Sequence, residues 1–74
     1  MHPFTEQVIR HRAVNAEGKP CEILERVTYE RQPDGADPVV INRRYDLKTG
    51  ERLIRVNDTE FEDDESGARL QLQP

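Results

Sequence analysis

The chain has 74 residues, of which 34% are hydrophobic and 35% are charged, and its formal net charge at pH 7 is −4. This length excludes a second domain, and the scarcity of apolar side chains predicts a thin core. The acidic total argues against a molecule covered by a phosphate-binding surface, although a local basic face is compatible with it. A thin core also leaves no room for the pocket of several hundred Å³ that enzymes use, so we expect one small domain over residues 1–74 without catalytic activity.

The beginning of the chain has the least regular pattern. Val8 and Ile9 are adjacent, so residues 5–14 are compatible with a strand or with a short helix. We favour a strand, because the turn-forming sequence "NAEG" would join it to the next segment as a hairpin. Whether residues 1–7 are ordered is left open. No apolar run has the length of a signal peptide or of a membrane span, so we expect a cytoplasmic protein.

Alternation of apolar and polar side chains predicts strands in the next two segments. The apolar face of residues 21–31 consists of Cys21, Ile23, Val27 and Tyr29. Leu24 and Glu25 break this alternation, which predicts a bulge or a second, smaller contact on the opposite face. Arg43 is the exception in residues 39–47, whose apolar face consists of Val39, Ile41, Tyr45 and Leu47.

The sequence "YDLKTGERL" predicts a hairpin. A three-residue loop that ends at Gly50 sets Tyr45 opposite Leu53 as an inner apolar pair. Further from the turn, Arg43 would lie opposite Arg55. Because like charges directly opposite each other are destabilising, this pair predicts that the ladder ends or splays there.

The sequence "FEDDESGARL" repeats this pattern with one more residue before its glycine. A four-residue loop that ends at Gly67 sets Phe61 opposite Leu70. In both hairpins an acid and an arginine are expected to pair on the outer face, namely Asp46 with Arg52 and Glu62 with Arg69. Turn chemistry explains every matched position, so we interpret the repeat as architecture rather than as a site.

Residues 45–70 also have a recognisable order of parts: an aromatic strand, a Gly turn, an "RL" step, a "VND" corner and a second aromatic strand. In this order the segment, about a third of the chain, resembles short proteobacterial β-sheet proteins that have no assigned function. The resemblance implies a small β-sheet protein and brings no activity or site residue.

Few residues are suited to catalysis or metal binding. Cys21 is the single cysteine, which excludes an intramolecular disulfide, and we expect it to be a small core residue. His2 and His11 cannot be paired with it by spacing. The acidic residues 58–65 lack the Gly and the final Glu of a calcium loop, so we interpret them as a solvated edge hairpin and expect no metal or cofactor.

Arginines are the most distinctive feature of the composition. The candidates for a partner-binding polar face are Arg26 and Arg44, with Arg10 or Arg12 beside them. Tyr29 and Tyr45 are expected on the core face rather than on the Arg-bearing face. This disfavours a nucleic-acid site, because bases stack on exposed aromatic side chains. The competing interpretation is that the arginines pair with similarly spaced acids, namely Glu22, Glu30, Asp46 and Glu62.

These observations predict an all-β fold, a small antiparallel meander of five to six strands that forms an open barrel or a single sheet. Burial of one face against a second copy would enlarge the thin core, so we expect a homodimer. The predicted function is a small protein–protein interaction module that acts through a sheet edge or its Arg-bearing face. The alternative is a nucleic-acid-binding protein that uses the Arg-rich face.

Overall fold

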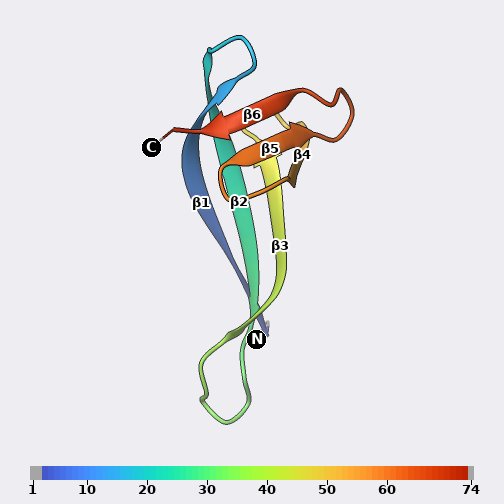
Figure 1. The fold of residues 1–74 in the computed structure, drawn as a ribbon. Helices are drawn as coiled ribbons and strands as arrows, with labels where there is room; N and C mark the ends of the chain where they lie inside the picture. Colours follow the sequence, from blue (N-terminus) through green and yellow to red (C-terminus); the bar gives the residue numbers. More distant parts are fainter. Residues whose placement is uncertain (1–2, 74) are drawn as a thin grey trace.

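The computed structural model describes residues 3–73, which form six strands and no helix (Figure 1). The strands are β1 (Phe4–Asn15), β2 (Pro20–Glu30), β3 (Val39–Leu47), β4 (Arg52–Arg55), β5 (Glu60–Asp63) and β6 (Arg69–Leu72). Each strand pairs antiparallel with the next, and β6 returns to β1, so the sheet closes into a barrel. The predicted all-β meander is confirmed. Within the described range, no helix is long and apolar enough to cross a membrane.

The first strand, the least certain from its pattern, is present and is long. It begins at Phe4, so residues 4–7, whose order was an open question, are part of it. Residues 1 and 2 lie outside the described residues.

The barrel is closed at one end of the molecule only. β6 pairs with β1 from Ala13 to Asn15, and β4 pairs with β3 at Tyr45 and Asp46. The rest of β1, β2 and β3 projects from the barrel as a three-stranded sheet (Figure 1), and we call it the arm, made of residues 4–12, 24–30 and 39–44. The molecule measures 49 × 25 × 19 Å and has a radius of gyration of 14.6 Å. A compact chain of this length would have about 11 Å, so the arm gives the protein an elongated shape.

The core fills the closed end of the barrel. Its buried members are Ala13, Ile23, Tyr45, Leu53, Phe61 and Leu70. The rings of Tyr45 and Phe61 have centroids 4.9 Å apart and planes 59° apart, a tilted arrangement that aromatic quadrupoles favour. Cys21 is partly buried and packs against this cluster, as expected of a small core residue.

Both predicted hairpin registers are confirmed. Tyr45 lies opposite Leu53, and Phe61 lies opposite Leu70. The first ladder ends at Tyr45, as the like-charge pair beyond it predicted. Gly50 closes the first turn with a φ of 109°, a conformation that residues with a Cβ rarely adopt.

The outer ion pairs predicted for these hairpins are wrong, although the registers are right. The carboxylate of Asp46 pairs with arginines of β2 and β3 rather than with Arg52. Arg69 pairs at 3.5 Å with Glu60 rather than with Glu62. Long side chains on a twisted sheet also reach diagonal neighbours, so a register alone does not select the ionic partner.

The acidic segment does not lie at a sheet edge, contrary to the prediction. β5 has β4 on one side and β6 on the other, because closure of the barrel removes the edge at this position. The turn that follows β5 is held by Asp63, whose Oδ1 accepts hydrogen bonds from the backbone N–H groups of Glu65 at 2.9 Å and Ser66 at 3.2 Å.

The alternation of β2 is regular, so the bulge predicted at Leu24 and Glu25 is wrong. Glu25 faces the interior and is 8% exposed, whereas Leu24 makes a partly buried contact on the opposite face, which was the alternative interpretation. The shift in register lies further along, between Thr28 and Tyr29, where β3 contributes Ile41 as the additional residue.

Two residues of β3 predicted for the core are not in it. Val39 and Ile41 are 51% and 49% exposed. Both lie on the arm, beyond the part of β3 that pairs with β4. Alternation therefore predicted the strand correctly, but it does not show how much of the strand is covered by the rest of the barrel.

Candidate functional site

The longest open strand edge in the described part of the chain belongs to β1. This strand pairs with β2 without interruption from Phe4 to Val14, but β6 covers its other side only from Ala13 onwards. In Figure 1, β1 runs along the outside of the arm with no strand beyond it. Residues 4–11 therefore present a row of backbone groups of the kind that another strand recognises.

The direction of each backbone group along this edge follows from hydrogen bonds at its ends. The Pro3 carbonyl accepts a hydrogen bond from Arg31 N–H at 2.7 Å, and Asn15 N–H donates to the Lys19 carbonyl at 2.9 Å. Both odd-numbered residues therefore bond on the β2 side. The even-numbered Arg12 accepts a hydrogen bond from Gln73 N–H at 2.9 Å, on the opposite side. Because the bonding direction alternates along an antiparallel strand, the N–H and C=O groups that point to the open edge are those of Phe4, Glu6, Val8 and Arg10.

Apolar side chains accompany this edge. The large apolar residues of the arm that are about half exposed are Phe4 and Val8 on β1 and Val39, Val40 and Ile41 on β3. No second layer of the described chain covers them, because the barrel closes at the other end. They do not form one patch, because Val39 shares the outer face with Phe4 and Val8, whereas Val40 lies opposite Tyr29 on the interior face. Phe4 and Val8 are the two that lie on the open edge itself.

The edge of β3 on the opposite side of the arm is less regular. It is open from Val39 to Arg44, because β4 pairs with β3 only at Tyr45 and Asp46. The additional residue Ile41 interrupts the row of backbone groups. A bulge at an edge disfavours the addition of another strand, so β1 is the better candidate.

The four predicted partner-binding arginines lie on one face of the sheet. Arg26 lies directly opposite Arg44 on one side and opposite Val8 on the other. Arg10 and Arg12 follow on β1, two and four residues beyond Val8, and therefore share this face. The structure thus brings the four arginines onto the outer face of β1, β2 and β3, the face that points away from the barrel interior.

Acidic side chains on the same face neutralise three of these arginines. Arg26 lies 3.4 Å from Glu6 and 3.4 Å from Asp46, which also pairs at 3.1 Å with Arg44. Arg10 lies 3.6 Å from Glu22. The alternative prediction, that the arginines pair with acids of similar spacing, is therefore confirmed for Glu22 and Asp46.

Arg12 differs from the other three arginines. Among residues 3–73 it forms no ion pair, although it lies next to the point where β6 leaves the edge of β1. Its charge is therefore available to a partner that binds along β1.

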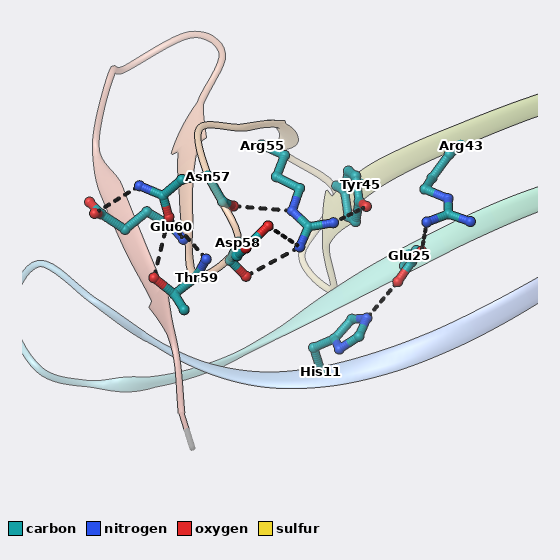
Figure 2. A network of polar contacts seen from close by, with 9 residues as sticks. All are labelled: His11, Glu25, Arg43, Tyr45, Arg55, Asn57, Asp58, Thr59 and Glu60. Carbon is teal, nitrogen blue, oxygen red and sulfur yellow. Dashed lines mark hydrogen bonds and ion pairs between the residues drawn. The ribbon is translucent and has the colours of Figure 1, made fainter.

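The interior face of the arm carries a polar cluster that the sequence analysis did not identify (Figure 2). Glu25 Oε1 lies 2.7 Å from His11 Nε2, and Glu25 Oε2 lies 3.3 Å from Arg43 Nη1. The Glu25 side chain is only 10% exposed, and a buried carboxylate needs partners of this kind. Glu25 and Arg43 are each a charged residue at an apolar position of their own strand, and this break in the alternation could have indicated the cluster from the sequence.

A second cluster holds the corner between β4 and β5 (Figure 2). Arg55 donates from Nη1 to Tyr45 Oη at 3.1 Å and from Nε to the Asn57 carbonyl at 3.1 Å. Asn57 Oδ1 in turn accepts from the backbone N–H groups of Thr59 and Glu60, both at 2.9 Å. These contacts hold the backbone corner, so we assign them a structural role.

A surface depression of about 680 Å³ lies along β1 and β2, and it is open to solvent rather than enclosed within the core. Its lining residues are Arg10, His11, Arg12, Pro20, Cys21, Glu22 and Gln73. Burial raises the pKa of the Cys21 thiol, which keeps it protonated and a poor nucleophile at neutral pH. Within residues 3–73, no group of three or more His, Cys, Asp or Glu side chains is placed to hold a metal ion.

Comparisons of the chain with protein-family models, with curated proteins and with solved structures give no match. The resemblance of residues 45–70 to short proteobacterial β-sheet proteins therefore stays a prediction. The open edge of β1 and the face beside it are the features from which a function is argued below.

Proposed function

We propose that this protein is a non-catalytic interaction module that binds another protein chain by adding a strand to the open edge of β1. The observation that carries this proposal is that residues 4–11 pair regularly with β2 while their other edge stays open. Strand addition obtains its affinity from main-chain hydrogen bonds, and the outward-pointing groups of β1 are arranged to form them.

Several features that protect edges in other proteins are missing from this segment. It contains no proline, its pairing with β2 has no bulge, and no element of the described chain covers it. Unprotected edges of this length are prone to pair with other strands. The edge is therefore interpreted as a binding element.

Charged side chains along the edge supply selectivity. Glu6, Arg10 and Arg12 alternate with the apolar Phe4 and Val8 on the outer face. A strand that places opposite charges against them is favoured, and one that places like charges against them is rejected. The partner is thus expected to be a strand of mixed charge rather than a purely apolar one.

The outer face is less suited to a nucleic acid. Arg26 and Arg44 share the carboxylate of Asp46, so part of their charge is already compensated. Tyr45 is buried in the core and cannot stack on a base. Protein binding is therefore the proposal, and nucleic-acid binding is the competing outcome of the test.

The test compares proline substitutions at the two edges of the arm. Val8→Pro removes an N–H that points to the open edge of β1, so it blocks strand addition without removing a hydrogen bond to β2. Val40→Pro is the matched control on the β3 edge, since Val40 lies opposite Tyr29, whose bonds point to β1.

Each variant and the original protein are used as bait in lysate of the source cell, with and without nuclease. We expect protein chains that are captured by the original protein and by Val40→Pro, and lost with Val8→Pro, in both nuclease conditions. Capture that depends on nucleic acid, or that is unaffected by Val8→Pro in a folded variant, would overturn the proposal.

A further inference from the structure

We propose that the strand accepted by β1 is β1 of a second copy of this chain, paired antiparallel about a two-fold axis at Val8. This inference rests on the proposed strand addition and specifies its partner. The arm of each copy would then contribute three strands to one continuous sheet, with the order β3-β2-β1-β1-β2-β3.

The edge is self-complementary in charge in this register. With Val8 of one copy opposite Val8 of the other, Glu6 lies opposite Arg10 of the second copy, and Arg10 opposite its Glu6. A two-fold axis therefore produces two pairs of opposite charge from one sequence. In the single chain these side chains form surface ion pairs, with Glu6 3.4 Å from Arg26 and Arg10 3.6 Å from Glu22, and exposed pairs of this kind contribute little to stability.

The ends of the edge also match. Phe4, which is 51% exposed, lies opposite Arg12 of the second copy, the arginine without an ion pair among the described residues. An aromatic ring and a guanidinium in this position form a cation–π contact. Thr5 lies opposite His11, and Gln7 lies opposite Ile9, so no pair in this register brings like charges together.

The backbone hydrogen bonds agree with the same register. Phe4, Glu6, Val8 and Arg10 direct their N–H and C=O groups to the open edge, as the bonds at Pro3, Asn15 and Arg12 require. An antiparallel pair bonds only when outward-pointing residues lie opposite one another, so even-numbered residues must face even-numbered residues. The axis at Val8 satisfies this condition for the Glu6–Arg10 pairs and the Val8–Val8 pair, whereas Arg12, opposite Phe4, already accepts a hydrogen bond from Gln73.

Neighbouring registers are worse. An axis at Glu6 or at Arg10 places two carboxylates or two guanidinium groups directly opposite each other. An axis at Gln7 sets Glu6 opposite Val8 and leaves both glutamates without a partner of opposite charge. An axis at Ile9 also pairs opposite charges, Glu6 with Arg12, but Val14 and Arg12 are already bonded to Gln71 and Gln73, so only the two Val8–Arg10 pairs could form all their backbone hydrogen bonds. Charge excludes the axes at Glu6, Gln7 and Arg10, and the free backbone groups then favour Val8 over Ile9.

Charge reversal tests this arrangement. Glu6→Arg and Arg10→Glu are prepared separately, and their association is measured by sedimentation equilibrium. Each single variant places like charges opposite each other in its own dimer, so its dimer dissociation constant is expected to rise by about tenfold or more relative to the original protein.

An equimolar mixture of the two single variants is the decisive sample. One copy with Glu6→Arg and one with Arg10→Glu form opposite-charge pairs at both positions, so the mixture is expected to regain the original dissociation constant as a heterodimer. A change confined to the fold of each chain, for example through Arg26 or Glu22, would not be repaired by mixing. A mixture no more associated than its components overturns the inference.

Two further outcomes separate this inference from the proposed function. If the original protein stays monomeric at millimolar concentration while Val8→Pro still abolishes capture of another protein, the second copy is the wrong partner and strand addition stands. If folded Val8→Pro behaves as the original protein does in both assays, strand addition fails and this inference fails with it.

Discussion

Glu25 on β2 and Arg43 on β3 form an ion pair of 3.3 Å on the interior face of the arm, where only 10% of the Glu25 side chain is exposed. His11 occupies the other carboxylate oxygen at 2.7 Å. Removal of one partner from such a site leaves a carboxylate with too few hydrogen bonds, which costs more than the loss of a surface pair.

We therefore expect Arg43→Met, which keeps the aliphatic stem, to lower the free energy of unfolding by about 1–2 kcal/mol. The value is below the range for fully buried pairs because the Arg43 side chain is 46% exposed. Arg10→Met is the control, since the Arg10 side chain is 73% exposed, and it should cost less than about 0.5 kcal/mol. If urea titrations show that Arg43→Met and Arg10→Met lose equal free energies of unfolding, Arg43 is not needed as the partner of the buried Glu25 carboxylate.

The Glu25–Arg43 pair also marks the limit of what this sequence predicts. Each residue is visible as a break in its strand, but their meeting depends on the register between β2 and β3. Residues 31–38 connect these strands through a long loop, and Ile41 adds a residue to one of them. Neither feature follows from local turn chemistry, which is why the pair was missed.

The short hairpins behave differently. Loops of three and four residues leave few registers, so the position of Gly50 was sufficient to place Tyr45 opposite Leu53. The sequence did not show how much of β3 is covered by the opposite wall of the barrel. Val39 and Tyr45 are both apolar positions in the same alternation, but Val39 is exposed on the arm and Tyr45 is buried in the core. The open edge of β1 depends on where β6 rejoins it at Ala13, which is a property of the whole barrel.

Gly50 should be essential to the first hairpin for a backbone reason alone. A Cβ at this position would meet nothing within 4 Å, so the cost of Gly50→Ala arises from its φ of 109°. We expect a loss of about 1–2 kcal/mol, and a fall of the melting temperature by about 4–8 °C for each kcal/mol. A chemically synthesised chain with D-alanine at this position is the control and should melt close to the original protein. Similar melting temperatures for the L- and D-alanine chains would be inconsistent with this explanation.

Arg55 should not be replaceable by lysine. Its guanidinium bonds to Tyr45 Oη and to the carbonyl groups of Asn57 and Asp58, and it lies 5.8 Å from the centroid of the Tyr45 ring. A lysine ammonium has no planar fork and cannot reproduce these bonds together. We expect Arg55→Lys and Arg55→Met to destabilise the protein similarly, by about 1–2 kcal/mol in chemical denaturation. Full stability of Arg55→Lys would mean that charge alone holds the corner.

The thiol of Cys21 should react slowly at neutral pH. Burial raises its pKa in the folded protein, and only the thiolate is alkylated. The rate of reaction with iodoacetamide plotted against pH is expected to be displaced to higher pH relative to the urea-unfolded chain. Coincident curves would show that the thiol is not shielded.

The same raised pKa has a consequence for stability. The unfolded chain loses the Cys21 proton at a lower pH than the folded chain, so the contribution of this thiol is fully present below the unfolded pKa. It is lost as the pH rises through the folded pKa. The difference in stability between the original protein and Cys21→Ala should therefore shrink on the alkaline side, and a difference independent of pH would contradict the assignment.

Hydrogen exchange along β1 should alternate from residue to residue in the monomer. The N–H groups of odd-numbered residues such as Gln7 and Ile9 donate to β2, whereas those of Glu6, Val8 and Arg10 point to the open edge. In dilute solution the even-numbered amides are therefore expected to exchange fast and the odd-numbered ones slowly, as resolved by NMR. Addition of a strand supplies acceptors to the even-numbered amides only, so their protection should rise with protein concentration while that of Gln7 and Ile9 stays nearly constant. Uniform exchange at low concentration would place the open edge elsewhere, and protection of Val8 that is independent of concentration would mean that its N–H is already bonded within one chain.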